Sequence, residues 1–432
     1  MRLFNFFFII ISIFHRIKVS VIVFPFKKYT QYIKNTNYIE YLLNNDIYID
    51  FKIGTPYQTI PLFLSIDDYP SYISGEELNE KYNRNSSSSY KQISFREEMF
   101  YFENFLSGYV SNETIEIINV KGEKEKIQNF AFIYVTSFPK KDVEVKSKSI
   151  LGLKLSGIYT IRKENFIHQF KENKIIDSMA WTIKYLNDNE GELIIGGFPH
   201  EYDNNYNEIN LRNVKAEMRI GTVFWDYIFS KVYSNDIIIG GEVRAYLDIR
   251  YGLIKGSFSY KKHIEENFLN DNNLCKKNDA LNHTIEYYVC DLKSKIKKFP
   301  KLIFEHRELK FNFELTYEDL FEKRDDGYYC KVVFKKNDEE EIFIFGKPFL
   351  KKYQIIFEPD RKLIGVYTKK TINILNVTLW VIIVFLAIII ISLIILIIKR
   401  NKNKPRKIRA NELDEEFIYK DISKEDDKLG IN

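Results

Sequence analysis

The longest uninterrupted apolar segment of the chain, Leu379–Ile398, constrains its fold most strongly. It reads LWVIIVFLAIIIISLIILII, and Ser392 is its one polar residue. An α-helix rises about 1.5 Å per residue, so a helix of this length just crosses a hydrocarbon core about 30 Å thick. A buried helix in a soluble protein rarely runs so far without a polar face. We therefore expect a transmembrane helix at residues 379–398.

Two further segments set the expected topology. Lys399–Arg409, directly after the apolar run, holds seven Lys and Arg residues, so the positive-inside rule predicts a cytoplasmic tail at residues 399–432. At the other end, Arg2 precedes the apolar run Leu3–Phe14, which is too short to span a bilayer and has the form of a secretory signal. We expect a signal peptide at residues 1–20, with an uncleaved anchor or an interfacial helix as alternatives. The chain is then a single-pass type I membrane protein of the secretory or endolysosomal pathway or the cell surface.

A luminal or extracellular location gives meaning to the cysteines and to several asparagines. Three cysteines in an oxidising compartment permit one disulfide and leave one thiol over. Asn85, Asn112 and Asn282 each begin an N-x-S/T sequon and are predicted to be glycosylated, whereas the sequon at Asn376 lies too close to the expected membrane helix. The net charge of +5 is small and comes partly from the basic segment, so we expect no nucleic-acid partner.

The region between Tyr38 and Thr368 has the pattern of a mostly-β domain large enough for two lobes. Many short segments alternate apolar and polar residues or are continuously apolar, and turn residues separate them. Examples are DIYIDFKIG, TIPLFLSI, IQNFAFIYVTSF, MAWTIKYL, GELIIGG, PKLIFEH, CKVVFKK and YQIIFE. Helical patterns are few and short, at Tyr260–Leu269, at Thr316–Lys323 and in RKENFIHQF.

Two segments of this region are imprecise copies of one another. IPLFLSIDDYPSYISG and EVRAYLDIRYGLIKGS each contain an apolar strand that ends in an aspartate, Asp67 in the first and Asp248 in the second. An aspartate at the end of a strand is more often a turn former or a cap than a catalyst. The pair therefore needs the context of the surrounding motifs.

That context comes from seven motifs in a fixed order. They are YIDFKIGTPYQTIPLFLSID, SSSSY, SGYVSNETIEI, SILGLKLSG, GELIIGGFPHEY, AYLDIRYGLIKGS and FIFGKPFLKKYQIIFEPDRKLIGVY. In this order they resemble the eukaryotic, pepsin-like aspartic peptidases. The resemblance implies an all-β, bilobal fold, with an N-terminal β lobe at residues 38–190 and a C-terminal β lobe at residues 191–370. It also implies that a peptide or protein binds in the cleft between the lobes, and that no cofactor or metal is needed.

The resemblance assigns roles to individual residues. Asp67 and Asp248 take the positions of the catalytic pair, and Tyr101 takes the position of the flap tyrosine that contacts substrate. Residues 21–37, which begin VIVFPFKKY, resemble a short pro-segment.

The resemblance also implies a disulfide. Cys290 and Cys330 bracket the region where the family has the disulfide of its C-terminal lobe, which predicts a Cys290–Cys330 bond. Cys275 then has three alternatives: a free thiol, a bond to Cys290 instead, or a bond to a second molecule.

The loops that follow the two aspartates depart from the family. Peptide hydrolysis needs two carboxylates that share one proton, and in the family each is followed by a hydroxyl residue, a glycine and a second hydroxyl residue. Here Asp67 is followed by Asp-Tyr-Pro and Asp248 by Ile-Arg-Tyr. Pro70 has no N–H to donate and Ile249 cannot join a lock of hydroxyl groups. Arg250, within ~4–6 Å of a carboxylate, would lower its pKa by ~1–3 units and favour two ionised carboxylates.

Two hypotheses follow. The first is a degenerate family member, a pseudo-peptidase that binds a peptide or protein in its cleft without cleaving it, and the altered loops favour it. The alternative is an active, membrane-anchored aspartic endopeptidase that uses the Asp67/Asp248 pair. A zinc hydrolase has no support, because the six histidines form no H-x-x-x-H motif or His/Cys cluster.

The predicted tail contains one short candidate motif. YKDI, at Tyr419–Ile422, fits a tyrosine-based endocytic signal that a sorting adaptor would bind. A solvated tail without a partner is the alternative.

Overall fold

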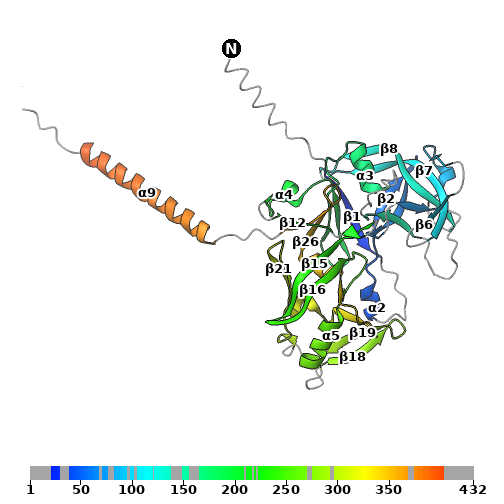
Figure 1. Cartoon of the computed structure of the whole chain (residues 1–432). Helices are drawn as coiled ribbons and strands as arrows, with labels where there is room; N and C mark the ends of the chain where they lie inside the picture. Colours follow the sequence, from blue (N-terminus) through cyan, green and yellow to red (C-terminus); the bar gives the residue numbers. More distant parts are fainter. Residues whose placement is uncertain are drawn as a thin grey trace, which may run out of the picture. The chain divides into compact units, whose positions relative to one another are not determined.

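The strands that the structure describes form two large sheets and one small hairpin (Figure 1). A computed structural model provides the coordinates, and the chain divides into two compact units, residues 1–370 and 371–432. The structure describes residues 21–29, 38–67, 71–75, 82–94, 98–101, 105–119, 121–137, 148–154, 165–208, 211–216, 218–219, 222–269, 275–291, 296–367 and 374–402.

The first sheet has 14 strands within these described ranges and takes strands from both halves of the sequence. In sheet order they are β12 Leu211–Lys215, β27 Leu363–Tyr367, β26 Gln354–Glu358, β10 Trp181–Tyr185, β11 Glu190–Ile195, β1 Ile22–Lys28, β2 Ile47–Ile53, β3 Gln58–Ser65, β9 Ser149–Gly152, β4 Tyr72–Ser74, β8 Lys124–Ser137, β7 Phe105–Ile118 and β5 Lys91–Gln92, with β6 Glu98–Tyr101 paired to β7. Strands β26 and β27 come from the predicted C-terminal lobe, yet they join this sheet beside strands of the predicted N-terminal lobe. The sheet therefore does not mark a boundary at residue 190, and that boundary stays a prediction.

The second sheet has 11 strands within the described part of the chain, all from its C-terminal half. In sheet order they are β21 Phe311–Leu315, β20 Leu302–His306, β15 Asp226–Ser234, β16 Ile237–Leu247, β25 Ile342–Phe345, β17 Ile254–Lys255, β24 Val332–Lys335, β19 Ile285–Cys290, β23 Gly327–Cys330 and β22 Phe321–Arg324, with β18 Cys275–Ala280 paired to β19. The hairpin consists of β13 Met218–Arg219 and β14 Thr222–Val223.

The helices that the structure describes in the first unit are short. They are α2 Tyr38–Leu43, η2 Arg84–Ser86, α3 Phe166–Glu172, α4 Pro199–Tyr202, α5 Phe258–Ile264 with the following π turn η4 Glu265–Leu269, α7 Tyr317–Leu320 and α8 Lys347–Lys352. The helices predicted in RKENFIHQF and at Tyr260–Leu269 correspond to α3 and to α5 with η4. The helix predicted at Thr316–Lys323 is only partly right, because α7 ends at Leu320 and residues 321–323 belong to strand β22. The mostly-β prediction is confirmed.

Strand β1 lies inside the first sheet, between β11 and β2. Its alternate residues Ile22, Phe24 and Phe26 are buried, as expected for a strand with one face in the core. Gly191 of β11 lies against Phe26, and a Cβ there would come within 2.3 Å of the Phe26 ring. The stretch that resembles a pro-segment therefore contributes a core strand, while residues 30–37 lie outside the described residues.

A serine-rich loop and a buried carboxylate stabilise the outer part of the first sheet. Glu113 of β7 is 1% exposed and accepts hydrogen bonds from the hydroxyl groups of Ser87, Ser89 and Tyr82 and from the Thr114 N–H. The sequence shows this loop only as a polar, low-complexity stretch. The serines of this loop turn toward Glu113 because a buried carboxylate is stable only when hydrogen bonds satisfy its oxygens.

The predicted Cys290–Cys330 disulfide is wrong. Cys275 of β18 and Cys290 of β19 are directly opposite one another in an antiparallel pair and form the disulfide, while Cys330 is a buried free thiol. Cross-strand register decides the partner, because directly opposed residues have the closest Cβ atoms. The alternative in which Cys275 bonds to Cys290 is the one that the structure has.

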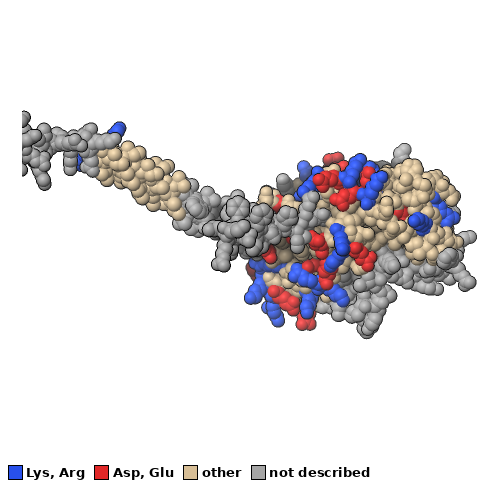
Figure 2. Space-filling model, turned by 90° about the horizontal axis from the view of Figure 1, so that it is seen from above, with Lys and Arg blue, Asp and Glu red and all other residues tan. Residues whose placement is uncertain are grey.

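The second unit contains one long helix, α9 Ile374–Lys402. Its segment Ile382–Arg400 is long and apolar enough to cross a membrane, and the side chains of this segment are exposed. Basic and acidic side chains mix on the face of the first unit seen in Figure 2, whereas the helix is uncharged along most of its length. These properties support the predicted membrane-spanning segment at residues 379–398 by length and composition.

Candidate functional site: an arginine between two aspartates

Asp67 and Asp248 each follow a strand, as predicted from sequence. Asp67 comes two residues after β3, and its N–H donates to Ser65 Oγ at 3.3 Å. Asp248 follows β16, and its N–H donates to the Phe345 carbonyl at 3.0 Å. Each strand has a parallel neighbour, β9 beside β3 and β25 beside β16, so the two aspartates occupy equivalent places in the two sheets.

Arg250 joins the two carboxylates. Its Nη2 donates to Asp67 Oδ2, and its Nε lies 3.7 Å from Asp248 Oδ1. The backbone N–H of Arg250 also donates to Asp248 Oδ1 at 2.9 Å. The three side chains are 31%, 24% and 32% exposed for Asp67, Asp248 and Arg250, so solvent reaches the site. The structure thus brings both predicted catalytic residues to one guanidinium group.

Burial dominates the electrostatics of Asp248. It raises the pKa of this carboxyl above the ordinary value of 3.8, the Arg250 charge and hydrogen bonds oppose the rise, and the Asp67 charge adds to it. The sequence predicts that Arg250 lowers the pKa of a neighbouring carboxyl, and the Arg250 charge does lower the pKa of Asp248. The net direction for Asp248 is upward, because the cost of burying its negative charge is larger.

The hydroxyl lock of the family is replaced by apolar packing on the second loop. Ile249, at the position of the lock hydroxyl, is fully buried in the main core. Tyr251 packs in a cluster that includes Ile39, Leu43 and Leu253. Asp68–Pro70, the corresponding residues of the first loop, lie outside the described residues.

Asn45 is a residue of the site that sequence reasoning missed. It is fully buried, its Nδ2 donates to the Ile249 carbonyl at 2.8 Å and to Tyr185 Oη at 3.0 Å, and its N–H donates to the Arg250 carbonyl at 2.9 Å. The sequence around it, LLNNDIYID, indicates only a turn before a strand. No local pattern reveals contacts with residues about two hundred positions away.

The structure gives less information on the remaining predicted residues. Tyr101 ends β6, and its side chain is outside the described part of the structure. Among the sequon residues, Asn85 and Asn282 are exposed, whereas Asn112 is half-buried on β7 with a buried side-chain oxygen. Tyr419–Ile422 lies outside the described residues.

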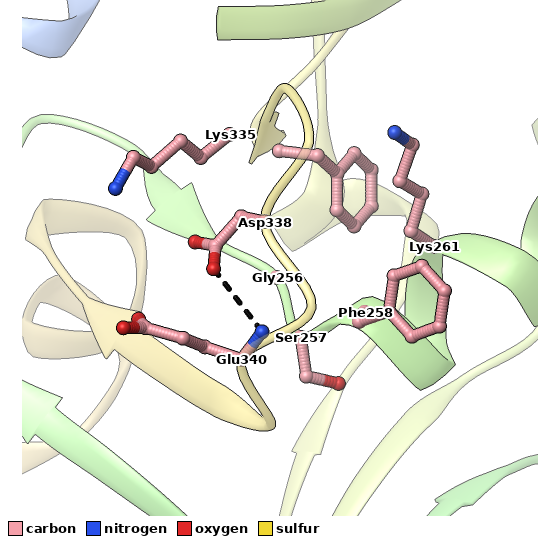
Figure 3. Close-up of a pocket in the computed structure, with 8 residues that line it drawn as sticks. Gly256, Ser257, Phe258, Lys261, Lys335, Asp338 and Glu340 are labelled. Carbon is pink, nitrogen blue, oxygen red and sulfur yellow. Dashed lines mark hydrogen bonds between the residues drawn. The ribbon is translucent and has the colours of Figure 1, made fainter.

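A separate hollow lies beside α5 in the region of the second sheet (Figure 3). Its lining includes Asp338 and Glu340, both ion-paired with Lys255 at 2.6 Å and 3.2 Å. The Glu340 N–H also donates to Asp338 at 3.1 Å, as Figure 3 shows. Because these carboxylates already have partners, we assign no ligand to the hollow.

Comparisons with known proteins agree with this fold. The family model described as eukaryotic aspartyl protease matches residues 48–369. Among solved structures, basic 7S globulin from soybean is similar at a TM-score of 0.59 and 12% identity, over 82% of this chain and 98% of that one. No curated protein matches the sequence. The fold is therefore pepsin-like, and the chain belongs to the eukaryotic aspartyl protease family.

Proposed function

We propose that this chain is a membrane-anchored pseudo-peptidase, which binds a peptide or protein between its lobes and does not cleave it. The observation that carries the proposal is the position of Arg250, whose guanidinium group pairs with Asp67 and Asp248. Hydrolysis by this family needs a water molecule between the carboxylates and one shared proton. A guanidinium group in that place donates to the oxygens that would otherwise activate the water.

The loop around Arg250 reinforces this block. The Arg250 N–H and side chain both contact Asp248, and Ile249 is held in the core. Moving the guanidinium out would leave a partly buried carboxylate without its cation, which is unfavourable. The blocked arrangement is therefore the stable state of the site in the absence of a ligand.

An active endopeptidase is the second candidate, and one observation favours it. Burial and the Asp67 charge raise the pKa of Asp248. A protonated Asp248 beside an ionised Asp67 is the protonation state that the family mechanism requires. If a substrate displaced Arg250, the Asp67/Asp248 pair would then be able to catalyse its hydrolysis.

The proposal includes a location. We infer a type I protein with a luminal or extracellular peptidase-like domain, glycosylated at Asn85 and Asn282, a membrane helix within α9 and a cytoplasmic tail that offers Tyr419–Ile422 to a sorting adaptor. The length of α9 and the Cys275–Cys290 disulfide support a secretory route. This orientation can be tested by adding a protease to intact and to permeabilised cells and comparing the fragments of the chain. Treatment with a glycosidase, followed by comparison of the electrophoretic mobility, tests the glycosylation.

The experiment uses the full-length chain in detergent, because β1 belongs to the first sheet and a truncated chain that starts at Tyr38 would lack it. Wild type, Arg250→Gly and Asp67→Asn/Asp248→Asn are incubated with a diverse peptide pool from pH 3 to 7, with and without a statine-type inhibitor. Recovery of peptides on the immobilised chain measures binding.

We expect wild type to bind peptides without cleaving them. Arg250→Gly should cleave at acidic pH at a rate at least about tenfold above the detection limit, which wild type does not exceed, and this corresponds to a barrier lower by at least about 1.4 kcal/mol. Inhibitor-sensitive cleavage by wild type that the double variant lacks would overturn the pseudo-peptidase and establish the endopeptidase. Neither binding nor cleavage by wild type would contradict both candidates.

A further inference from the structure

We propose that Asn45 is a positioning residue, which fixes the turn from Asp248 to Tyr251 so that Arg250 reaches Asp67. This inference rests on the proposed role of Arg250. Asn45 lies just before β2 of the first sheet, and the turn that it contacts follows β16 of the second sheet. The residue thus connects the two sheets at the site.

The side chain of Asn45 acts through its two amide hydrogens. One donates to the Ile249 carbonyl at 2.8 Å and the other to Tyr185 Oη at 3.0 Å. Its Oδ1 is buried and has no hydrogen-bond partner among the described residues. A buried acceptor without a partner is unfavourable, so the value of an asparagine here lies in its donors.

The backbone continues the same connection on both sides of Asn45. The Asn45 N–H donates to the Arg250 carbonyl at 2.9 Å, and Asn44 forms a bridge with Tyr251. The Gly252 N–H then donates to the Leu43 carbonyl at 2.9 Å. A short antiparallel pairing therefore runs from Arg250 to Gly252, at the end of the turn.

Close approach at Gly252 fixes the register of this pairing. A Cβ at position 252 would come within 1.7 Å of the Leu42 carbonyl oxygen, so only glycine fits. Helix α2 holds the other side, because Ile39 and Leu43 are buried against Leu253 and Tyr287. The segment that carries Asn45 is thus anchored independently of the guanidinium.

The carbonyls held by Asn45 flank the Cα atom of Arg250. Ile249 O belongs to the peptide bond before Arg250, and Arg250 O belongs to the peptide bond after it. When both peptide planes are held, the direction of the Cα–Cβ bond is set, and the side chain starts toward the carboxylates. Loss of the side-chain donors leaves the first plane with the hydrogen bond from the Arg250 N–H to Asp248 Oδ1 but without the one from Asn45, and this looser hold lets the guanidinium leave Asp67.

The test measures how fast phenylglyoxal modifies individual arginines in the full-length chain, by peptide mass spectrometry. Rates are expressed relative to the same arginine in the urea-unfolded chain. The variants are Asn45→Ala and the milder Asn45→Ser. Asn44→Ala is the matched control, because Asn44 is exposed, its contact with Tyr251 is made by the backbone, and its side chain accepts from the Asp46 N–H at 2.9 Å instead of donating to the turn that carries Arg250. Arg244, which pairs with buried Asp226 at 3.4 Å, reports on the fold as a whole.

We expect Arg250 to be protected in wild type and Asn44→Ala. In the Asn45 variants it should react roughly five- to tenfold faster, which is the factor that one typical hydrogen bond controls, while Arg244 keeps its protection. Equal protection of Arg250 in all variants would overturn the inference about Asn45 and leave the role of Arg250 intact. Loss of protection at Arg244 together with Arg250 in both Asn45 variants would also overturn it, because Asn45 would then support the fold generally. An unprotected Arg250 in wild type would contradict the proposed function itself.

Discussion

Arg250, in the second half of the chain, forms an ion pair with Asp67, which lies 183 positions earlier in the sequence. Both side chains are about one-third exposed, so solvent screens the pair and its contribution to stability is modest. Its importance lies in its place, because the same guanidinium also faces Asp248. The pair affects the chemistry of the site more than the stability of the fold.

The first prediction concerns the pH dependence that Asp248 creates. Burial holds its native pKa above 3.8, so the native chain binds this proton more tightly than the unfolded chain does. The stabilisation is fully present below pH 3.8 and is lost as the pH rises through the higher native pKa. Asp248→Asn should therefore gain stability relative to wild type between pH 4 and 7, measured as the difference in thermal midpoints. Asp50→Asn, a half-exposed carboxylate paired with Lys27, is the control, and an equal gain there would contradict the prediction.

The second prediction concerns Lys28, at the end of β1. Burial, with repulsion from Lys347, lowers its pKa from 10.5 to about 8. The unfolded chain binds this proton more tightly, so this lysine makes the native chain gain stability as the pH rises from 8 to 10.5. Lys28→Met should stabilise the domain at pH 7 by about 1–3 kcal/mol and abolish that gain, since each pKa unit corresponds to about 1.4 kcal/mol.

Urea unfolding of Lys28→Met at pH 7 and pH 10 checks this expectation. Lys27→Met is the matched control, because Lys27 is the neighbouring residue and its side chain is 54% exposed. A loss of stability in Lys28→Met at pH 7 would mean that the hydrogen bond from Lys28 Nζ to the Tyr41 carbonyl outweighs the cost of burying the charge.

The third prediction concerns the buried carboxylate Glu113. Glu113→Gln should destabilise the domain by about 2–4 kcal/mol, because hydrogen bonds from Ser87, Ser89 and the Thr114 N–H lose a charged acceptor inside the protein. Ser87→Ala should cost about 1 kcal/mol. Ser88→Ala is its control, since Ser88 is exposed and donates to the Thr55 carbonyl instead. Equal costs for the two serine variants, measured by urea unfolding, would contradict the arrangement.

The fourth prediction concerns the disulfide. Cys275 and Cys290 are 15 positions apart, and closing a loop of this size stabilises a fold by about 3 kcal/mol in the chain-entropy account. Cys275→Ser should lose about that much, while Cys330→Ala should keep the bond. Peptide mapping without reductant identifies the linked cysteines. A peptide that joins Cys290 to Cys330 in the native chain would contradict the structure.

Local patterns predicted the elements of this fold well. The alternating segment IYIDFKI and the apolar segment TIPLFLSI each form a strand. The spacing of apolar residues predicts them because it reflects whether one or both faces of a strand are buried. The order of motifs identified the family, and it placed Asp67 and Asp248 at strand ends. The resemblance of residues 21–37 to a pro-segment is local and stays a prediction, whereas the place of β1 between β11 and β2 is a long-range property that no local pattern shows.

The resemblance of the motifs located the two loops, after Asp67 and Asp248, that depart from the family's pattern. The sequence by itself also determined the mostly-β domain and the long apolar helix. These follow from composition and short-range periodicity, which act within a few residues. Only the tertiary structure decided that Arg250 turns toward both carboxylates, that Asn45 holds its turn and that Cys275, not Cys330, bonds to Cys290. Each of those outcomes depends on which strands are neighbours and in which register, and that is set by packing of the whole core rather than by any local pattern.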